Sequence, residues 1–122
     1  MEIRELTGTT TAGGALTVTD TQRLDGVYIE RVVMDYDDAD TGAGATLTCE
    51  GPMAQAVLIQ AALGVADREW YPRALGNKNT DGSAFTDVAV KMFVSGTLKL
   101  VIAAGGATKN VRFLVYCSKN DE

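Results

Sequence analysis

The sequence contains no histidine, and this removes the commonest general base and metal ligand in proteins. A Ser–His or Cys–His nucleophilic site is therefore excluded. Cysteine is scarce too: Cys49 and Cys117 are too few for a disulfide scaffold or, without histidine, for a Cys/His zinc site. Whether these two form a single bridge stays open, because the sequence does not give their separation in space. We expect a protein that is not an enzyme and that holds no metal or other cofactor.

Basic residues are in the minority, with 11 Lys and Arg against 16 Asp and Glu and a net charge of −5. Because phosphate binding needs an excess of cations, we expect neither nucleic acid nor an anionic membrane as a partner. No apolar run reaches the length of about eighteen residues that a membrane-spanning helix needs. The first residues lack the basic start and apolar stretch of a secretory signal, which favours folding in a cytosol. A length of 122 residues favours one domain over 1–122.

Most of the chain alternates apolar and polar residues with a period of two, which is typical of half-buried strands. Two stretches, 98–104 and 111–117, are the clearest. Their apolar faces consist of Leu98, Leu100, Ile102 and Ala104 and of Val111, Phe113, Val115 and Cys117. The segment Gly105–Asn110 between them is small and polar, which predicts a hairpin loop.

Further strands are predicted upstream. Val88–Val94 alternates in the same way and stops at Ser95-Gly96. Val27–Tyr36 is rich in β-branched and aromatic residues, and the break in its alternation near Glu30-Arg31 predicts a bulge or an edge position. Shorter candidates, separated by turn-forming clusters, are Ile3–Leu6, Leu16–Thr19, Ala45–Glu50 and Trp70–Leu75. Together they predict an all-β fold, an antiparallel sandwich of about eight strands.

The segment 51–64 fits two structures. Its Ala-rich apolar residues recur at helical spacing, with Pro52 as a first helical residue and Gly64 as a cap, which predicts a short helix near 53–63. The alternative is a strand from Ala56 to Ala61, supported by the strands predicted on both sides. We favour the strand, because a sandwich needs this partner.

Asp35–Asp40 is the densest charged segment, with four aspartates in six residues. Carboxylate oxygens are ligands that Ca²⁺ prefers, but the spacing does not match an EF-hand loop. The twelfth residues counted from Asp35 and Asp38 are Thr46 and Cys49, where that loop has a glutamate. An acidic, solvated loop at the end of a strand is the favoured interpretation, and calcium binding stays an alternative.

Trp70-Tyr71-Pro72-Arg73 is the most conspicuous aromatic and cationic cluster. Trp, Tyr and Arg are enriched at protein interfaces, and Pro72 restricts its strand to an edge or a bulge because it has no N–H. The alternative is that Trp70 fills core space and Tyr71 places its hydroxyl at the rim. The sequence supports the two interpretations equally.

After this cluster come Asn79-Thr80-Asp81-Gly82-Ser83-Ala84, Gly96–Ile102, Gly105-Gly106 and the closing strand Val111–Tyr116. In this order the motifs resemble a family of small structural proteins from tailed bacteriophages, especially marine ones. The N-terminal half is similar only in style, through Thr/Gly-rich turns and the strand start Gly26-Val27-Tyr28. Met53–Leu63 departs from the family pattern, because it is Ala-rich where the family has a Thr-rich strand.

The resemblance implies a jelly-roll-like β-sandwich that decorates or cements the phage head, commonly as a trimer. It implies the major capsid protein as the partner and the outer surface of the virion capsid as the location, after assembly in the cytoplasm of the bacterial host. Many copies of an acidic protein would also stay soluble before assembly.

We place the contact surface near Trp70, Tyr71 and Arg73, with Ile3 and Arg4 of an N-terminal arm as a second candidate. Terminal strands can add to the edge of a neighbour's sheet, so we expect 1–14 to form an arm or an edge strand. Two alternatives stay open. One is a minor tail or head-fibre component. The other is a carbohydrate- or ligand-binding sandwich that uses Trp70, Tyr71 and the Asp35–Asp40 loop.

Overall fold

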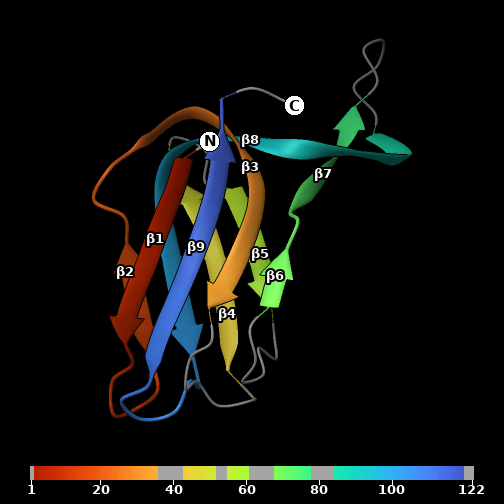
Figure 1. Cartoon of the computed structure of the whole chain (residues 1–122). Helices are drawn as coiled ribbons and strands as arrows, with labels where there is room; N and C mark the ends of the chain where they lie inside the picture. The colour runs from red at the N-terminus through yellow and green to blue at the C-terminus, as the bar shows by residue number, and fades with distance from the viewer. Residues whose placement is uncertain (1, 36–42, 52–54, 61–67, 78–83, 120–122) are drawn as a thin grey trace.

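The computed structural model describes residues 2–35, 43–51, 55–60, 68–77 and 84–119 (Figure 1). These residues form nine β-strands and no helix, which confirms the all-β prediction. The strands are β1 (Glu2–Thr9), β2 (Leu16–Thr19), β3 (Leu24–Asp35), β4 (Gly44–Glu50), β5 (Gln55–Gln60), β6 (Arg68–Trp70), β7 (Arg73–Asn77), β8 (Ala84–Ala103) and β9 (Asn110–Ser118).

All of these strands except β7 build two antiparallel layers that face each other. One layer has the order β1-β9-β3-β6 and the other the order β2-β8-β4-β5. Along this set, each step from one strand to the next passes to the other layer, apart from the step from β4 to β5. This is the strand order of an eight-stranded jelly roll. The predicted sandwich and its jelly-roll-like arrangement are confirmed for the described strands.

Strand β8 takes part in both layers. It pairs with β3 from Met92 to Gly96 and with β4 from Thr97 to Ala103. Gly96 lies at this passage with a φ of +138°, which a residue with a side chain rarely adopts, and a Cβ there would overlap the carbonyl oxygen of Glu50. The prediction that a strand stops at Ser95-Gly96 is wrong, because this glycine marks a change of partner within a strand that continues.

The core lies between the layers and consists of the inward-facing residues of both. Its largest fully buried side chains are Phe113, Leu6, Leu24, Ile29, Met34, Leu47, Leu98, Leu100, Ile102, Val32 and Val94. The apolar faces predicted for the last two strands are therefore confirmed, with one exception. Ala104 lies beyond the end of β8, where it is exposed and has a φ of +57°.

The predicted hairpin between the last two strands is wrong. Residues 97–103 of β8 pair with β2 and β4, whereas β9 pairs with β1 and β3, so these two parts of the chain lie in opposite layers. The connection between them is held against the turn that follows β1. The Gly105 N–H donates to the Gly14 carbonyl (2.8 Å), and the Thr10 N–H donates to the Lys109 carbonyl (2.8 Å). The glycines of this connection therefore lie in a segment that crosses from one layer to the other, and not in a hairpin turn.

The interruption predicted in the third strand is confirmed as a bulge. The register between β3 and β9 shifts between Ile29 and Arg31, which leaves Glu30 without an opposite residue. Residues on both sides of the bulge still face the core, because the extra residue changes which side of the strand points inward. Ile29 is buried before it, and Val32 and Met34 are buried after it.

Two other predictions concern the middle of the chain. Residues 55–60 form the strand β5, which confirms the favoured strand in its described part and shows the helix prediction to be wrong there. The remainder of 51–64 lies outside the described residues, apart from Gly51. The single strand predicted over Trp70–Leu75 is instead two strands, β6 and β7, separated by Tyr71-Pro72. Pro72 cannot donate to a ladder, and this favours a break at that position.

Strand β7 and residues 84–91 of β8 form a two-stranded ribbon, which we call the arm. In Figure 1 the arm extends sideways from the sandwich, away from the two layers. Arg73 pairs with Lys91 at its base, followed by Ala74 with Val90 and Leu75 with Ala89. Among the described strands, β7 pairs with β8 alone.

Candidate functional site

The base of the arm is a junction at which β3 changes its partner. β3 pairs with β8 up to Ile29 and with β6 from Val32 onward, and the bulge at Glu30 lies between the two ladders. β8 turns away from β3 here, and the chain leaves β6 to enter β7. The junction brings together the residues that the sequence singles out between Trp70 and Arg73, so we treat it as the candidate interaction site.

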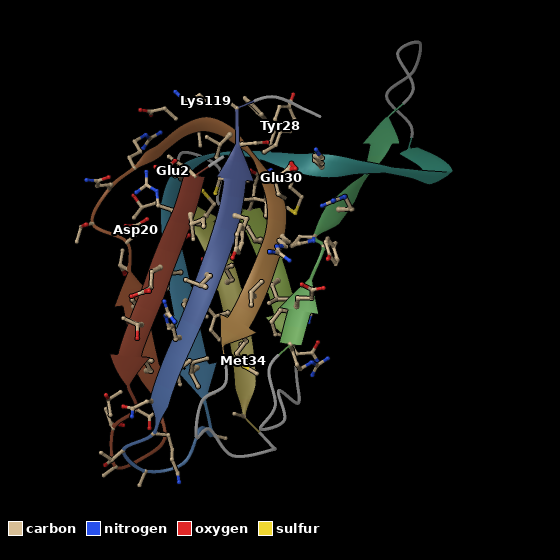
Figure 2. The ribbon with its side chains drawn as sticks, in the orientation of Figure 1. Glu2, Asp20, Tyr28, Glu30, Met34 and Lys119 are labelled. Atoms are coloured by element: carbon tan, nitrogen blue, oxygen red, sulfur yellow. The ribbon has the colours of Figure 1, made fainter. Side chains whose placement is uncertain are left out.

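Glu30 connects the arm to the sandwich. Its Oε2 accepts hydrogen bonds from Lys91 Nζ in the arm (2.8 Å) and from Ser118 Oγ at the end of β9 (3.2 Å). Figure 2 shows Glu30 on β3, close to the crossing of β8. The side chains of Glu30 and Lys91 are only 17% and 14% exposed, so water screens this ion pair weakly. The hydrogen bond from Lys91 holds the pKa of Glu30 below its usual range, and the carboxylate stays charged.

Arg73 begins the other strand of the arm and faces the same bulge. Its Nη1 donates to the carbonyls of Pro72 (2.7 Å), Glu30 (3.2 Å) and Ile29 (3.5 Å). A bulge leaves backbone groups without ladder partners, and a guanidinium supplies donors for such carbonyls. Arg73 therefore fixes the first residue of β7 against β3. Its contact with another molecule stays a prediction.

Trp70 packs within the sandwich. Its ring stacks on the buried Phe113 with centroids 5.9 Å apart and planes 7° apart, and the Arg68 guanidinium lies 5.3 Å from its centroid. Its Nε1–H donates to Gln60 Oε1 (3.1 Å). Gln60 belongs to β5, so Trp70 joins the two layers at this side of the sandwich. Of the two interpretations of Trp70, its packing against the core is the one that the structure describes.

Tyr71 is exposed and takes part in a polar and aromatic row on the outer face of the first layer. The side chain is among the exposed large hydrophobic groups, and its hydroxyl donates to Glu69 Oε1 (2.9 Å). Glu69 Oε2 accepts from Arg31 Nη1 (3.0 Å), and the Arg31 guanidinium lies 4.3 Å from the ring centroid of Tyr116. The row thus continues across β6, β3 and β9. Aromatic residues and arginine are enriched at protein–protein interfaces, and this row contains both.

Ile3 and Arg4 lie on β1, which is an edge strand of the first layer. Ile3 is 53% exposed. Arg4 is instead engaged within the chain: Nη2 lies 3.0 Å from Glu2 Oε2, and Nη1 lies 3.2 Å from Asp20 Oδ2. Arg4 therefore ties β1 to the chain that follows β2. Of this second predicted pair, Ile3 has the more accessible side chain.

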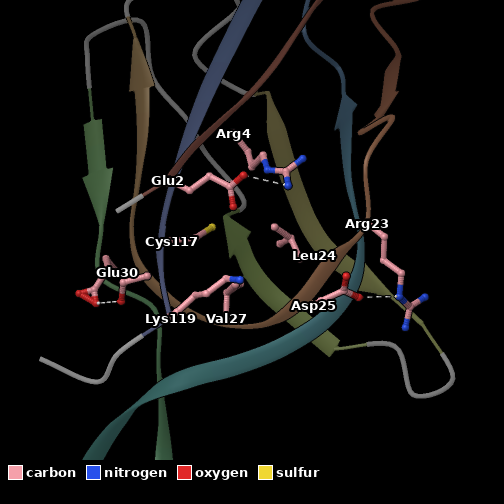
Figure 3. A pocket seen from close by; sticks show the side chains of 10 residues that line it. Glu2, Arg4, Arg23, Leu24, Asp25, Val27, Glu30, Cys117 and Lys119 are labelled. Atoms are coloured by element: carbon pink, nitrogen blue, oxygen red, sulfur yellow. Dashed lines mark hydrogen bonds and ion pairs between the residues drawn. The ribbon is translucent and has the colours of Figure 1, made fainter.

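A hollow of about 910 Å³ opens at the end of the sandwich where β1 begins and β9 ends (Figure 3). Its lining combines buried apolar residues with charged residues of both signs. The apolar part is Leu24, Val27 and Cys117, and the charged part is Glu2, Arg4, Arg23, Asp25, Glu30 and Lys119. The volume is in the range of small-molecule sites. The charges of the two signs balance, so the hollow favours neither an anion nor a cation.

The two cysteines are free and buried, which answers the question of a bridge. Burial raises the pKa of the Cys117 thiol to about 12 and raises that of Cys49 as well. The nucleophilic form of cysteine is the thiolate, so Cys117 at the hollow is inert at neutral pH. These thiols therefore serve as small apolar core groups.

The acidic segment Asp35–Asp40 lies outside the described residues, apart from the backbone of Asp35 at the end of β3. Its calcium binding stays an alternative. Within the described ranges, no group of three or more acidic or cysteine side chains is placed to hold a metal ion.

No family model matches the chain, and neither the curated proteins nor the solved structures contain a match. The described part of the chain also contains no helix long and apolar enough to cross a membrane.

Proposed function

We propose that this chain is a non-enzymatic structural protein of a virion, a capsid decoration protein that binds the outer surface of a tailed-phage head. The observation that carries the proposal is a jelly-roll body from which a two-stranded arm extends. Jelly rolls are frequent among viral capsid proteins. A two-stranded ribbon is at best marginally stable in water unless it packs against something else. Both features suit a protein whose final state is an assembly.

The proposed partner is the major capsid protein, and the proposed oligomer is a trimer on the capsid surface, formed after synthesis in the bacterial cytoplasm. The similarity of Trp70–Arg73 and of the motifs after it to phage structural proteins supports this choice. The junction supports it as well, since Tyr71 is exposed there and Arg73 holds the start of the arm through its hydrogen bond to the Glu30 carbonyl. We place the contact with the shell at this exposed side of the junction.

Such a protein would stabilise the shell because it binds the assembled lattice in preference to separate subunits. At a free concentration of about 100 times its Kd, binding stabilises each site by about 2.7 kcal/mol. A trimer that engages several subunits gains further, because its second and third contacts form within one complex. Small individual interfaces would therefore be sufficient.

Quantitative mass spectrometry of purified virions tests the proposal. We expect a ratio to the major capsid protein near parity or near a simple fraction of it. A few copies per particle would instead support a minor tail or head-fibre component. Absence from the particle would contradict both virion roles.

Binding to particles that lack the chain provides a second test. Purified chain is expected to bind such particles and to raise the temperature at which their shells open. Variant Tyr71→Ala should bind more weakly, while Thr17→Ala, an exposed residue on the opposite layer, serves as the matched control. Equal binding by both variants would contradict a contact at the junction.

The carbohydrate-binding alternative gains no support from the described residues. Sugar-binding tryptophans present a free ring face, but Phe113 and Arg68 already lie against the ring of Trp70. Tyr71 remains accessible, and its proposed role in shell contact uses the same accessibility.

A further inference from the structure

We propose that β7 pairs with β7 of a second copy of this chain across a two-fold axis, so that two arms form one antiparallel ribbon in the order β8-β7-β7-β8. The inference goes beyond the proposed function, because it concerns association of the free chain and holds whether or not a capsid is the partner. It rests on the edges of the strands and on the base of the arm.

The arm combines a fixed base with an open ribbon. At the base, the Glu30–Lys91 ion pair (2.8 Å) and the hydrogen bonds of Arg73 to backbone carbonyls hold both strands against β3. Beyond the base, β7 pairs with β8 and with no other described strand. Three or more strands, or a packed face, are needed for a stable sheet. Pairing of two arms would supply a four-stranded sheet.

The other open edges of the sandwich have features that discourage strand addition. β1 carries the ion-paired Arg4 on the same side as the buried Leu6, so a charge is turned inward at this edge. β5 has a register shift in its ladder with β4 between Leu47 and Thr48. β2 and β6 are short, at four and three residues.

The outer edge of β7 lacks these features. It is uncharged from Ala74 to Asn77, in a chain with a net charge of −5. The arm does have an irregularity between Leu75 and Asn77, but the extra residues lie in β8, between Ala84 and Ala89. β7 therefore keeps the spacing of a regular strand, as a new ladder requires.

A two-fold axis also matches the charges along this edge. If all five residues of β7 pair, Leu75 lies opposite Leu75 of the second copy, and Arg73 lies opposite Asn77. No like charges face each other across this axis. Such an isologous contact uses one surface on both copies and closes at two. One such edge on each copy is therefore sufficient to form the dimer.

Substitutions at position 75 test the axis directly. Like charges directly opposite each other weaken an antiparallel pair, and opposite charges strengthen it. We expect Leu75→Glu and Leu75→Lys each to lower the self-association constant by about fivefold or more. An equimolar mixture of the two variants should recover association, as a mixed dimer. Sedimentation velocity at low ionic strength is the measurement, because salt screens exposed charges.

Matched controls separate this contact from others. Leu75→Thr removes the same leucine without a charge and should associate more tightly than either charged variant. Ile3→Lys places a charge on the exposed isoleucine of β1 and should leave association unchanged. Circular dichroism and thermal unfolding of each variant establish that the sandwich is intact, so weaker association is not a consequence of unfolding.

Three results would overturn the proposal. The first is a wild-type chain that sediments as a monomer up to about 1 mM. The second is a mixture of Leu75→Glu and Leu75→Lys that associates no better than each variant alone, since position 75 would then not face itself. The third is a loss of association in Ile3→Lys, which would place the contact at β1. None of these measurements uses a virion, so failure here is distinct from failure of the capsid proposal.

Discussion

The sandwich and the arm are held together in different ways. In the sandwich, residues distant in sequence meet across two layers, and side chains such as Phe113 and Leu100 are fully buried. In the arm, the described interactions are the ladder between β7 and β8 and the polar contacts at its base. The described contacts of the first region bury apolar area, whereas those of the second are hydrogen bonds and an ion pair, which water can replace.

The difference separates folding from association. A region with its own core is expected to fold as a monomer. A two-stranded ribbon is marginally stable alone and gains stability when a partner adds strands to it, so the arm is the part of this chain that an assembly would stabilise most. The bulge at Glu30 lies where the sandwich meets the arm, because the register between β3 and β9 shifts at this position. Substitutions in the sandwich should therefore change the free energy of unfolding, whereas substitutions in the arm should change association.

The largest expected effect is on the sandwich. Phe113→Ala removes a fully buried ring and the surface on which Trp70 stacks, and we expect the free energy of unfolding to fall by about 3–5 kcal/mol. Phe93→Ala is the matched control, because this ring is 54% exposed and packs on the ring of Tyr28, with centroids 4.9 Å apart. Its loss should cost about 1 kcal/mol. Urea unfolding of both variants measures the difference, and equal losses would contradict the core assigned here.

Trp70 comes next. Trp70→Ala removes the stack on Phe113 and the hydrogen bond to Gln60, and because the residue is partly exposed we expect a loss of roughly 2–3 kcal/mol. Trp70→Phe keeps a ring and loses the Nε1–H donor, which should cost about 1 kcal/mol. Thermal unfolding distinguishes the two. A fully stable Trp70→Ala variant would contradict this packing role.

The connection between sandwich and arm should show a smaller effect. Glu30→Gln removes the charge that Lys91 faces, and we expect a loss of about 1–2 kcal/mol at neutral pH. Glu50→Gln is the control, since its carboxylate lies 3.8 Å from Lys99 and both side chains are well exposed. A surface pair of this kind contributes less than about 1 kcal/mol. Equal effects of the two substitutions would contradict the special position of Glu30.

The same pair predicts a dependence on pH. The hydrogen bond from Lys91 lowers the pKa of Glu30 in the folded chain below its ordinary value of 4.5, so the folded state binds fewer protons than the unfolded state there. The stabilisation is complete above 4.5 and is lost as the pH falls through the lower folded value. The difference in unfolding free energy between wild type and Glu30→Gln should therefore shrink below this pH. A difference that stays constant would argue against the assigned pair.

The smallest effect on stability is expected from removal of the arm itself. Ala74 and Val90 face each other in the ladder, so residues 75–89 can be replaced by Asn-Gly, a two-residue hairpin turn. We expect the free energy of unfolding to change by less than about 1 kcal/mol, since the shortened loop also has less entropy to lose. Association should disappear in the same variant. A loss of several kcal/mol would make the arm part of the folding unit.

Features set by period and local chemistry could be predicted from the sequence. The strand at Leu16–Thr19 has the predicted bounds, and the broken alternation near Glu30-Arg31 correctly indicated a bulge. Pairing was harder to predict. The stretches 98–104 and 111–117 alternate alike whether they pair or face each other across a core, so their pattern favours a hairpin where the structure has a crossing between layers. A glycine such as Gly96 is typical of a strand end, but here it marks the point where β8 changes from one layer to the other.

The sequence indicates the cluster Trp70-Tyr71-Pro72-Arg73, and the structure places it at the base of the arm. The sequence does not indicate the contacts among Glu30, Lys91 and Ser118, because these residues come from strands far apart in sequence and their contact depends on topology. The bulge signal at Glu30 was visible, but nothing local connects it with Lys91.

Hydrogen exchange of the full-length wild-type chain, measured at a low and a high protein concentration, tests the central distinction between sandwich and arm most directly. We expect amides of β9, such as those of Phe113 and Val115, to be equally protected at both concentrations. Amides of Ala74–Asn77 should exchange rapidly at low concentration and become protected at high concentration. Equal protection of β7 at both concentrations would show that the arm needs no second copy for its stability.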